Sequence, residues 1–182
     1  EYKFPFGWGE LWGIASRTNY DLSKHMEYSK ESLEYLDPET NEKYIPYVVE
    51  PSLGVERLFL TVLCDAYHKD MVNNEEREVL KLHPFLAPIK VTVLPLVKKY
   101  HNEKALEIYK NLSKYFMCSY DESGSIGKRY RRADVVGTPF CVTVDDETIN
   151  NNTVTIRDRD TMEQITLSLD ELKDYITEKI EF

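Results

Sequence analysis

The pattern of apolar and polar positions predicts strands near the start of the chain, followed by an amphipathic helix. Residues 1–15 alternate large apolar side chains with small or polar ones, and residues 44–50 form a second extended apolar run. Residues 21–41 between them are charged, which predicts a helix followed by a loop. Apolar residues recur from Val55 at the spacing of one helix face, so we predict a helix over residues 55–67 with that face buried.

A change of pattern near residue 80 predicts a domain boundary. Residues 70–78 are polar and charged, and the pairs His83-Pro84 and Ala87-Pro88 that follow disfavour helix. The sequence therefore predicts a first domain over residues 1–80 and a second over residues 81–182.

The second half of the chain alternates short apolar runs with amphipathic stretches. The pattern predicts strands at residues 89–94, 117–120, 140–144, 153–157 and 164–167, and helices at residues 102–116 and 125–136. Ser168 and Glu171 have the spacing of a capping box, which predicts a final helix. This order is typical of a small α/β domain with a mixed sheet of about five strands.

Composition narrows the class of protein. The sequence has no run of about 18 apolar residues, so we expect no membrane span and a cytoplasmic location. The formal net charge of −9 disfavours broad electrostatic binding of nucleic acid, so any RNA contact has to be local. Three separated cysteines and four histidines without ligand spacing predict neither disulfides nor a metal site.

Polar groups converge where the second predicted strand meets the helix. Arg57 falls in the first helical turn, where a cation opposes the helix dipole by about 0.3–1 kcal/mol, so a bound anion such as a nucleotide phosphate would explain its position. Glu50 ends the apolar run, and a ligand ammonium group would offset the cost of ionising it there. Ser52 adds a hydroxyl, and Gly54 permits close approach to the backbone. The residues alone equally allow a simple turn, with Glu50 and Arg57 paired to each other or to neighbours.

A resemblance favours the ligand site. Residues 47–57, Tyr-Val-Val-Glu-Pro-Ser-Leu-Gly-Val-Glu-Arg, are similar to the third signature motif of class II aminoacyl-tRNA synthetases, in the form found in dimeric glycyl-tRNA synthetases. Leu53 stands where a small residue is common, and Glu56 where Asp is common. The resemblance implies that glycine is bound by Glu50, Pro51, Ser52, Leu53 and Gly54, and ATP by Gly54, Val55, Glu56 and Arg57, with Arg57 as the catalytic residue.

An upstream segment adds to the same resemblance. Residues 7–15, Gly-Trp-Gly-Glu-Leu-Trp-Gly-Ile-Ala, resemble the family strand that contacts ATP, which implies ATP-binding roles for Glu10 and Leu11. Without the resemblance, a carboxylate at the rim of a sheet is the simpler interpretation of Glu10. Residues 17–22 also resemble the family and imply a place for Arg17 beside glycine.

Four cations within five residues form a second candidate site: Lys128, Arg129, Arg131 and Arg132. On a helix, Lys128, Arg131 and Arg132 form a stripe that suits RNA phosphates or unstacked bases, although a solvated face is the simpler interpretation. Residues 125–130, 137–140 and 157–161, with Asp134, resemble the anticodon-binding domain shared by glycyl, histidyl, prolyl and threonyl synthetases. That resemblance implies tRNA contact by the four cations. Phe85 stands where a basic residue is common.

The resemblance implies an α/β (α+β) fold class: the C-terminal piece of a class II antiparallel-sheet catalytic domain, followed by a mixed-sheet anticodon-binding domain. The intact enzyme would be a homodimer that uses ATP and Mg²⁺ to convert glycine to glycyl-adenylate and passes glycine to tRNA(Gly). The first two signature motifs are absent from these residues, so we expect the chain alone to be inactive. The alternative is a non-catalytic accessory protein that binds tRNA or another RNA through an anticodon-binding domain.

Overall fold

The computed structural model describes residues 1–72 and 74–181, which form two compact units, Glu1–Cys64 and Asp65–Phe182. The first unit contains short strands and two helices, in the order β1 (Tyr2–Phe4), β2 (Gly7–Gly9), β3 (Trp12–Thr18), α1 (Tyr20–Ser29), β4 (Tyr35–Leu36), β5 (Lys43–Tyr44), β6 (Val48–Leu53) and α2 (Val55–Ala66). Helix α2 ends two residues into the second unit.

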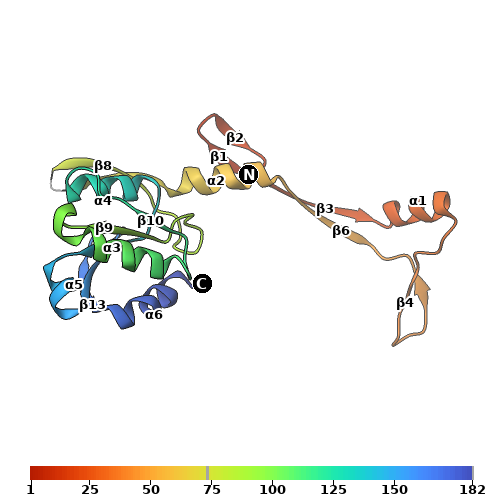
Figure 1. Ribbon diagram of the computed structural model, residues 1–182. Helices are drawn as coiled ribbons and strands as arrows, with labels where there is room; N and C mark the ends of the chain where they lie inside the picture. The colour runs from red at the N-terminus through yellow and green to blue at the C-terminus, as the bar shows by residue number, and fades with distance from the viewer. Residues whose placement is uncertain (73, 182) are drawn as a thin grey trace. The chain divides into compact units, whose positions relative to one another are not determined.

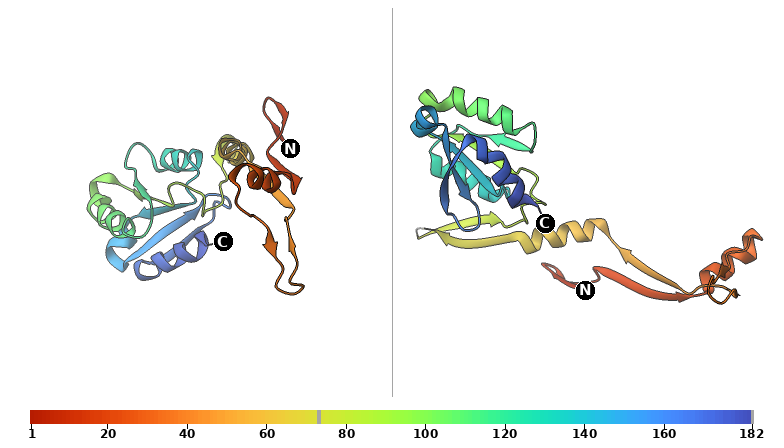
Figure 2. Two further views of the ribbon diagram at one scale, coloured as in Figure 1. Left: turned by 90° about the vertical axis from the view of Figure 1, so that its right-hand side faces the viewer. Right: turned by 90° about the horizontal axis from the view of Figure 1, so that it is seen from below.

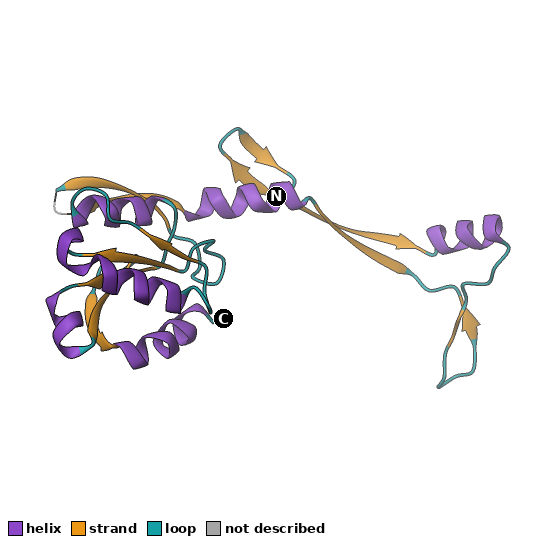
Figure 3. Ribbon diagram, viewed as in Figure 1, coloured by secondary structure: helices purple, strands orange, loops and turns teal. Residues whose placement is uncertain are grey.

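The first unit has almost no hydrophobic core of its own. Its strands form three separate antiparallel pairs, β1–β2, β3–β6 and β4–β5, and Figure 3 shows β3 and β6 side by side as a two-stranded ribbon. Among its described apolar side chains only Phe4 is buried, where it stacks on Phe6 and meets the edge of Tyr2. On the β3–β6 ribbon, Trp12, Ile14 and Val49 are exposed, and Val48 and Leu53 are half-buried.

Two predictions for this unit need correction. The helix at residues 55–67 is confirmed as α2, but its apolar face is not buried, because Val55 and Phe59 are 72% and 65% exposed and nothing in the described chain covers them. The pattern predicts a helix followed by a loop over residues 21–41. The helix is present as α1, which ends at Ser29, but the segment after it forms the short hairpin β4–β5 instead of a plain loop. Tyr35 packs against Tyr44 across that hairpin, an aromatic pair that the sequence pattern did not reveal.

A hairpin occupies the segment predicted as a polar boundary. Strands β7 (Tyr67–Val72) and β8 (Glu75–Leu80) pair in antiparallel register with Asp70 opposite Arg77. Arg77 and Val79 point inward and are buried, whereas Glu76 and Glu78 are exposed. The hairpin belongs to the second unit, which therefore begins before the predicted limit at residue 81.

The second unit is built on a five-stranded mixed sheet, as the sequence predicts. Its order is β10 (Cys118–Tyr120), β9 (Val91–Pro95), β11 (Phe140–Val144), β12 (Thr153–Asp158) and β13 (Gln164–Ser168). Strand β9 lies parallel to β10 and β11, whereas β12 pairs antiparallel with β11 and β13. All residues of β9 and β11 are buried, which explains why they are apolar apart from Thr92 and Thr143.

Helices cover both faces of this sheet (Figures 1 and 2). Helices α3 (Lys98–Leu112) and α6 (Leu169–Ile180) pack on one face and form the main core with Val93, Val142 and Ile156. Helix α4 (Ile126–Val135) packs on the other face, against Leu94 and Cys141. A short helix, α5 (Asp146–Asn151), was not predicted.

The predicted cap of the last helix is confirmed. The hydroxyl of Ser168 accepts a hydrogen bond from the Glu171 amide, and the Glu171 carboxylate accepts one from the Ser168 amide. No helix within residues 1–72 and 74–181 is both long and apolar enough to cross a membrane.

Candidate functional site

The predicted glycine and ATP residues gather at the junction of β3, β6 and α2. Strands β3 and β6 pair so that Gly13 lies opposite Ser52 and Ala15 lies opposite Glu50. Strand β6 ends at Leu53, and α2 begins at Val55 after the single residue Gly54. The end of β6, with Glu50 and Ser52, and the first turn of α2 are therefore joined at one junction, as the sequence predicts.

Arg57 bridges the start of α2 and the start of β3. Its Nη1 donates a hydrogen bond to the carbonyl oxygen of Glu10. Its aliphatic carbons pack over Gly54, where an added Cβ would lie 3.7 Å from Arg57 Cβ. The side chain is exposed and hydrogen-bonded on one side, so the guanidinium keeps donors for an anionic ligand.

The Glu10 carboxylate lies over Gly13. A Cβ added at Gly13 would stand only 3.1 Å from Glu10 Oε1, so a larger residue there would push the carboxylate away. The sequence did not show this contact, which gives Gly13 a role in placing Glu10. Leu11, the other predicted ATP residue of this segment, adjoins Glu10 before β3 begins.

The protein itself places a cation, Arg17, beside Glu50. Arg17 Nε lies 3.4 Å from Glu50 Oε2 and 2.8 Å from Asp21 Oδ2. The hydrogen bond with Asp21 raises the pKa of Arg17 and lowers the pKa of the Asp21 carboxyl. The Glu50 side chain is 50% exposed, so the expectation that it is desolvated and needs a ligand ammonium group is wrong for this chain. Arg17 does lie beside Glu50, one of the residues that the resemblance places against glycine.

The other predicted residues of the junction are also accessible. Pro51, Ser52, Val55 and Glu56 are exposed, and Leu53 is half-buried. The structure brings them onto one strand and one helical turn, where a ligand can reach them.

In the second unit, the four predicted cations do not share one environment. Lys128 and Arg132 are exposed and Arg131 is half-buried on α4, as expected for a basic stripe. Arg129 is only 4% exposed and donates hydrogen bonds to the carbonyl oxygens of Gly124 and Pro95. Arg129 therefore holds the loop before α4 and is not available to RNA, contrary to the sequence-based prediction.

Arg132 is already paired within the protein. Its Nε and Nη2 donate to Asp121 Oδ2 at 2.8 and 2.6 Å, and Nη2 also donates to the Ser123 carbonyl oxygen. It lines a hollow of about 370 Å³ on one side of α4, together with Thr92 and Ser119. This pairing reduces the charge that Arg132 can offer to a phosphate.

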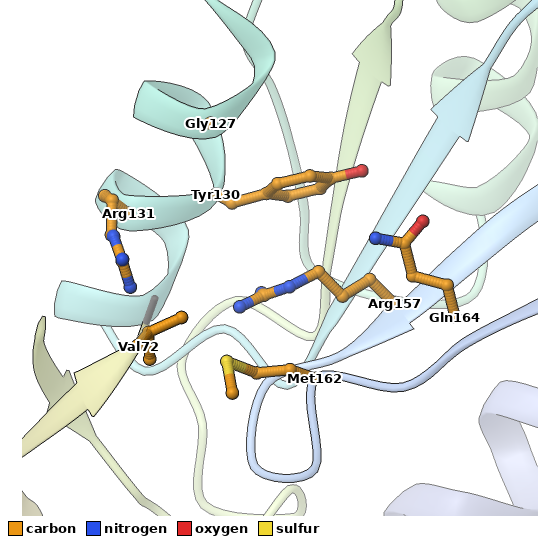
Figure 4. Close-up of a pocket in the computed structure, with 7 residues that line it drawn as sticks. All are labelled: Val72, Gly127, Tyr130, Arg131, Arg157, Met162 and Gln164. Atoms are coloured by element: carbon orange, nitrogen blue, oxygen red, sulfur yellow. The ribbon is translucent and has the colours of Figure 1, made fainter. Parts of the chain in front are cut away.

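A second hollow, of about 390 Å³, adjoins the opposite side of α4. Figure 4 shows its seven lining residues: Val72, Gly127, Tyr130, Arg131, Arg157, Met162 and Gln164. The Arg157 guanidinium lies 4.9 Å from the centre of the Tyr130 ring, and the Tyr130 hydroxyl lies 2.8 Å from Thr143 Oγ1. The hollow thus combines an aromatic ring, two guanidinium groups and an amide.

A buried network of charges lies behind this hollow. The carboxylate of Asp134 is fully buried and accepts hydrogen bonds from Arg157 at 2.9 and 3.1 Å and from Arg77 at 3.3 Å. Arg159 is also buried and donates to the carbonyl oxygens of Gly137 and Leu82. Asp134, Arg157 and Arg159 all lie within the segments that carry the family resemblance and serve the architecture of the unit. Of the three, Arg157 also lines the hollow.

Comparisons with known proteins identify both parts of the chain. A family model described as "Anticodon binding domain" matches residues 90–179. The chain is 60% identical over 183 residues to the glycine–tRNA ligase of Clostridium tetani (strain Massachusetts / E88), and 56% identical over 182 residues to that of Bacillus cereus (strain ZK / E33L). Each match covers 100% of this chain. Over its whole length the chain is therefore similar to part of a glycine–tRNA ligase. It spans 39% and 40% of the length of these two ligases.

A solved structure has a fold similar to that of this chain. The RNA binding domain of threonyl-tRNA synthetase from Cryptosporidium parvum Iowa II matches with a TM-score of 0.63, over 81% of this chain and 35% of that chain. The two sequences are 23% identical, so the likeness concerns the fold. It agrees with the mixed α/β architecture that the sequence predicts.

The ion pair between Asp70 and Arg77, in the middle of the hairpin β7–β8, predicts a stability that depends on acid pH. The hydrogen bond from Arg77 lowers the pKa of Asp70, so the unfolded chain binds a proton there more readily than the folded chain does. The stabilisation is present above about pH 4, the usual range of an aspartate, and is lost as the pH falls through the lower pKa of the folded state.

We therefore expect Asp70→Asn to flatten the fall in unfolding free energy below about pH 4, as measured by urea unfolding between about pH 2.5 and 7. Asp174→Asn, at a carboxylate that is 85% exposed, serves as the control. An Asp70→Asn profile parallel to that of the unmodified chain over the whole range would contradict the prediction.

Proposed function

We propose that the protein containing this chain is a glycine–tRNA ligase of class II that activates glycine with ATP and transfers it to tRNA(Gly). The observation that carries the proposal is the 56–60% identity to glycine–tRNA ligases over the whole chain. In this proposal the natural protein is a cytoplasmic homodimer, and the chain supplies part of the active site and the tRNA-contacting domain.

The junction of β3, β6 and α2 is the proposed part of the active site. Arg57 would bind the anionic part of ATP with the donors that Glu10 leaves free, and Glu50 and Ser52 would face the amino acid. Such a site acts by orienting the reactants and stabilising charge that develops at phosphate. It is open to solvent in this chain, so other parts of the protein are required to enclose the substrates.

The junction is compatible with magnesium, but binding of the ion would require the phosphates of the nucleotide. The described residues contain no cluster of three or more His, Cys, Asp or Glu able to hold a metal ion. Mg²⁺ in nucleotide sites is commonly bound by one or two carboxylates together with substrate phosphates, and Glu10 is the carboxylate placed to take part. When bound, the ion would neutralise phosphate charge.

The exposed apolar side chains of the first unit support the proposal that this unit is part of a larger catalytic domain. Ile14 and Val49 on the ribbon are 74% and 65% exposed, and Val55 and Phe59 on α2 are comparably exposed. A concentration of exposed apolar side chains of this kind often marks an interface. We infer that further elements of the catalytic domain cover it, which agrees with the greater length of the curated relatives.

The proposed tRNA surface lies on α4 and the hollow beside it. Arg131 lines the hollow and Lys128 is exposed on the same helix, so both provide the positive charge that phosphates require. Tyr130 provides an aromatic ring on which an unstacked base can lie, the usual mode of single-stranded RNA recognition. Arg157, which is 6% exposed, packs against that ring and reaches the hollow with only a small part of its surface. The local cluster is consistent with RNA binding by a chain whose net charge is negative.

Replacing Lys128, Arg131 and Arg132 together with alanine is expected to weaken tRNA(Gly) binding about tenfold or more and to flatten its salt dependence, because fewer counterions are released. Filter binding or fluorescence anisotropy at about 50–200 mM salt measures both quantities. The matched control replaces Lys110, Lys114 and Lys173, which are exposed on or beside α3 and α6, on the other face of the sheet. Equal loss in both triple variants would argue for non-specific attraction and against the α4 surface.

Charging of tRNA(Gly) with radiolabelled glycine by the natural full-length protein tests the whole proposal. Glycyl-tRNA formed in an ATP-dependent manner is the expected result. Tight tRNA binding by a natural protein that forms no glycyl-tRNA would favour the accessory RNA-binding hypothesis instead.

A further inference from the structure

The hairpin β7–β8 contributes to the wall of the α4 hollow, although it lies outside residues 90–179 that match the anticodon-binding family model. Val72, at the end of β7, is one of the residues that line the hollow, and Figure 4 shows it below Arg131. Five residues later along the chain, Arg77 on β8 points inward and is 1% exposed. The hairpin thus supplies both a surface residue and a buried charge to this region.

Arg77 is held from three directions. Its Nε and Nη2 donate to the two carboxylate oxygens of Asp70 on the paired strand, at 2.7 and 2.5 Å. Its Nη1 donates to Asp134 of α4 at 3.3 Å and to the carbonyl oxygen of Arg159 at 2.9 Å. Arg77 therefore ties the hairpin to the helix that carries the basic stripe and to the loop after β12.

Asp134 connects Arg77 to the hollow. Its carboxylate is shared between Arg77 and Arg157, and the bidentate bond from Arg157 fixes the plane of that guanidinium against the Tyr130 ring. A buried carboxylate shared by two cations is restrained more tightly than one held by a single partner, because each lone pair has a donor in a fixed direction. Without Arg77, Asp134 would keep its two hydrogen bonds from Arg157 but lose the donor that restrains this pair from the hairpin.

We propose that Arg77 is a positioning residue of the RNA site: through Asp134 it holds Arg157 and α4 in the arrangement that accepts RNA. This inference rests on the proposed tRNA role of the α4 hollow. It extends the RNA-binding unit to the hairpin of residues 67–80, which contributes no cation of its own to the rim of the hollow.

Arg77→Gln is expected to lower the affinity of the chain for tRNA(Gly) about fivefold to tenfold, a range typical of coupled neighbouring groups. The measurement is made at a temperature where circular dichroism shows the variant fully folded. Arg77→Lys, which keeps the charge but not the three-directional geometry, is expected to restore only part of the affinity.

Arg159→Gln is the matched control, because Arg159 is equally buried in the same unit but does not line the hollow. It is expected to reduce stability while leaving the tRNA affinity of the folded chain unchanged. If Arg77 had only a structural role, Arg77→Gln and Arg159→Gln would bind tRNA(Gly) with the same affinity once folded. Equal tRNA affinities in these two variants would therefore overturn the proposal.

A double-mutant cycle with Arg157→Gln separates this inference from the proposed function. If Arg77 acts through Arg157, Arg77→Gln produces little further loss of affinity once Arg157 is replaced. Full additivity of the two losses would refute the positioning role while leaving the RNA site intact. Unchanged affinity in Arg157→Gln itself would instead refute the role of the hollow, and with it the basis of the inference.

Discussion

Replacing Arg57 with alanine in the natural full-length protein is expected to lower glycine-dependent exchange of pyrophosphate into ATP about 100-fold or more. That is the loss commonly seen when one preorganised charge-stabilising donor is removed from an active site. The structure gives the reason. Arg57 is fixed by its bond to the Glu10 carbonyl oxygen and by packing over Gly54, so little reorganisation is needed when a phosphate arrives.

The conservative variant and a surface control make this test specific. Arg57→Lys retains a charge but loses the planar donor fork, so it is expected to recover only part of the activity. Lys24→Ala removes an exposed cation of α1 that pairs only with Glu27 among the described residues, and it is expected to leave the rate unchanged. Full exchange activity in Arg57→Ala would remove the main support for placing ATP at this junction.

The fold of the second unit could be predicted because its signals are local. Strands β9 and β11 are buried on both faces and therefore consist of apolar residues apart from Thr92 and Thr143, a pattern visible without any knowledge of their partners. The start of α6 is fixed by two side chains three residues apart, Ser168 and Glu171. These features depend on short-range chemistry that the sequence displays directly.

The hairpin β7–β8 could not be predicted because its inward face carries a charge. Arg77 and Val79 alternate with glutamates, and a buried arginine makes this alternation look like a polar loop. Burial of Arg77 is possible only because Asp70 and the distant Asp134 accept its hydrogen bonds. That compensation is a tertiary property, and no window of the sequence contains all three residues.

The candidate sites show the same division between local and tertiary information. The order of strand, glycine and helix places Glu50 and Arg57 at one junction, and the sequence predicted this. It could not show that Arg17 lies beside Glu50, because that contact depends on the pairing of β3 with β6. Nor could it show that Arg129 is the inward member of the basic cluster, because the acceptors are backbone carbonyl oxygens.

The largest effect on stability is expected at Asp134. Replacing it with alanine leaves Arg77 and Arg157 buried without their shared carboxylate, and breaking a buried ion pair in this way typically costs about 3–5 kcal/mol. That is a large fraction of the 5–15 kcal/mol that stabilises a typical domain. Urea unfolding of the 182-residue chain, followed by circular dichroism, measures the change.

Two comparisons decide whether the loss arises from the buried charges. Asp174→Ala removes an 85% exposed carboxylate and is expected to change the unfolding free energy by no more than about 0.5 kcal/mol. In an Arg77→Gln background, Asp134→Ala leaves one fewer uncompensated guanidinium, so its cost is expected to be smaller than in the unmodified chain. An equal cost in both backgrounds would mean that Asp134 stabilises the fold independently of Arg77, and that the hairpin and α4 are not coupled through this carboxylate.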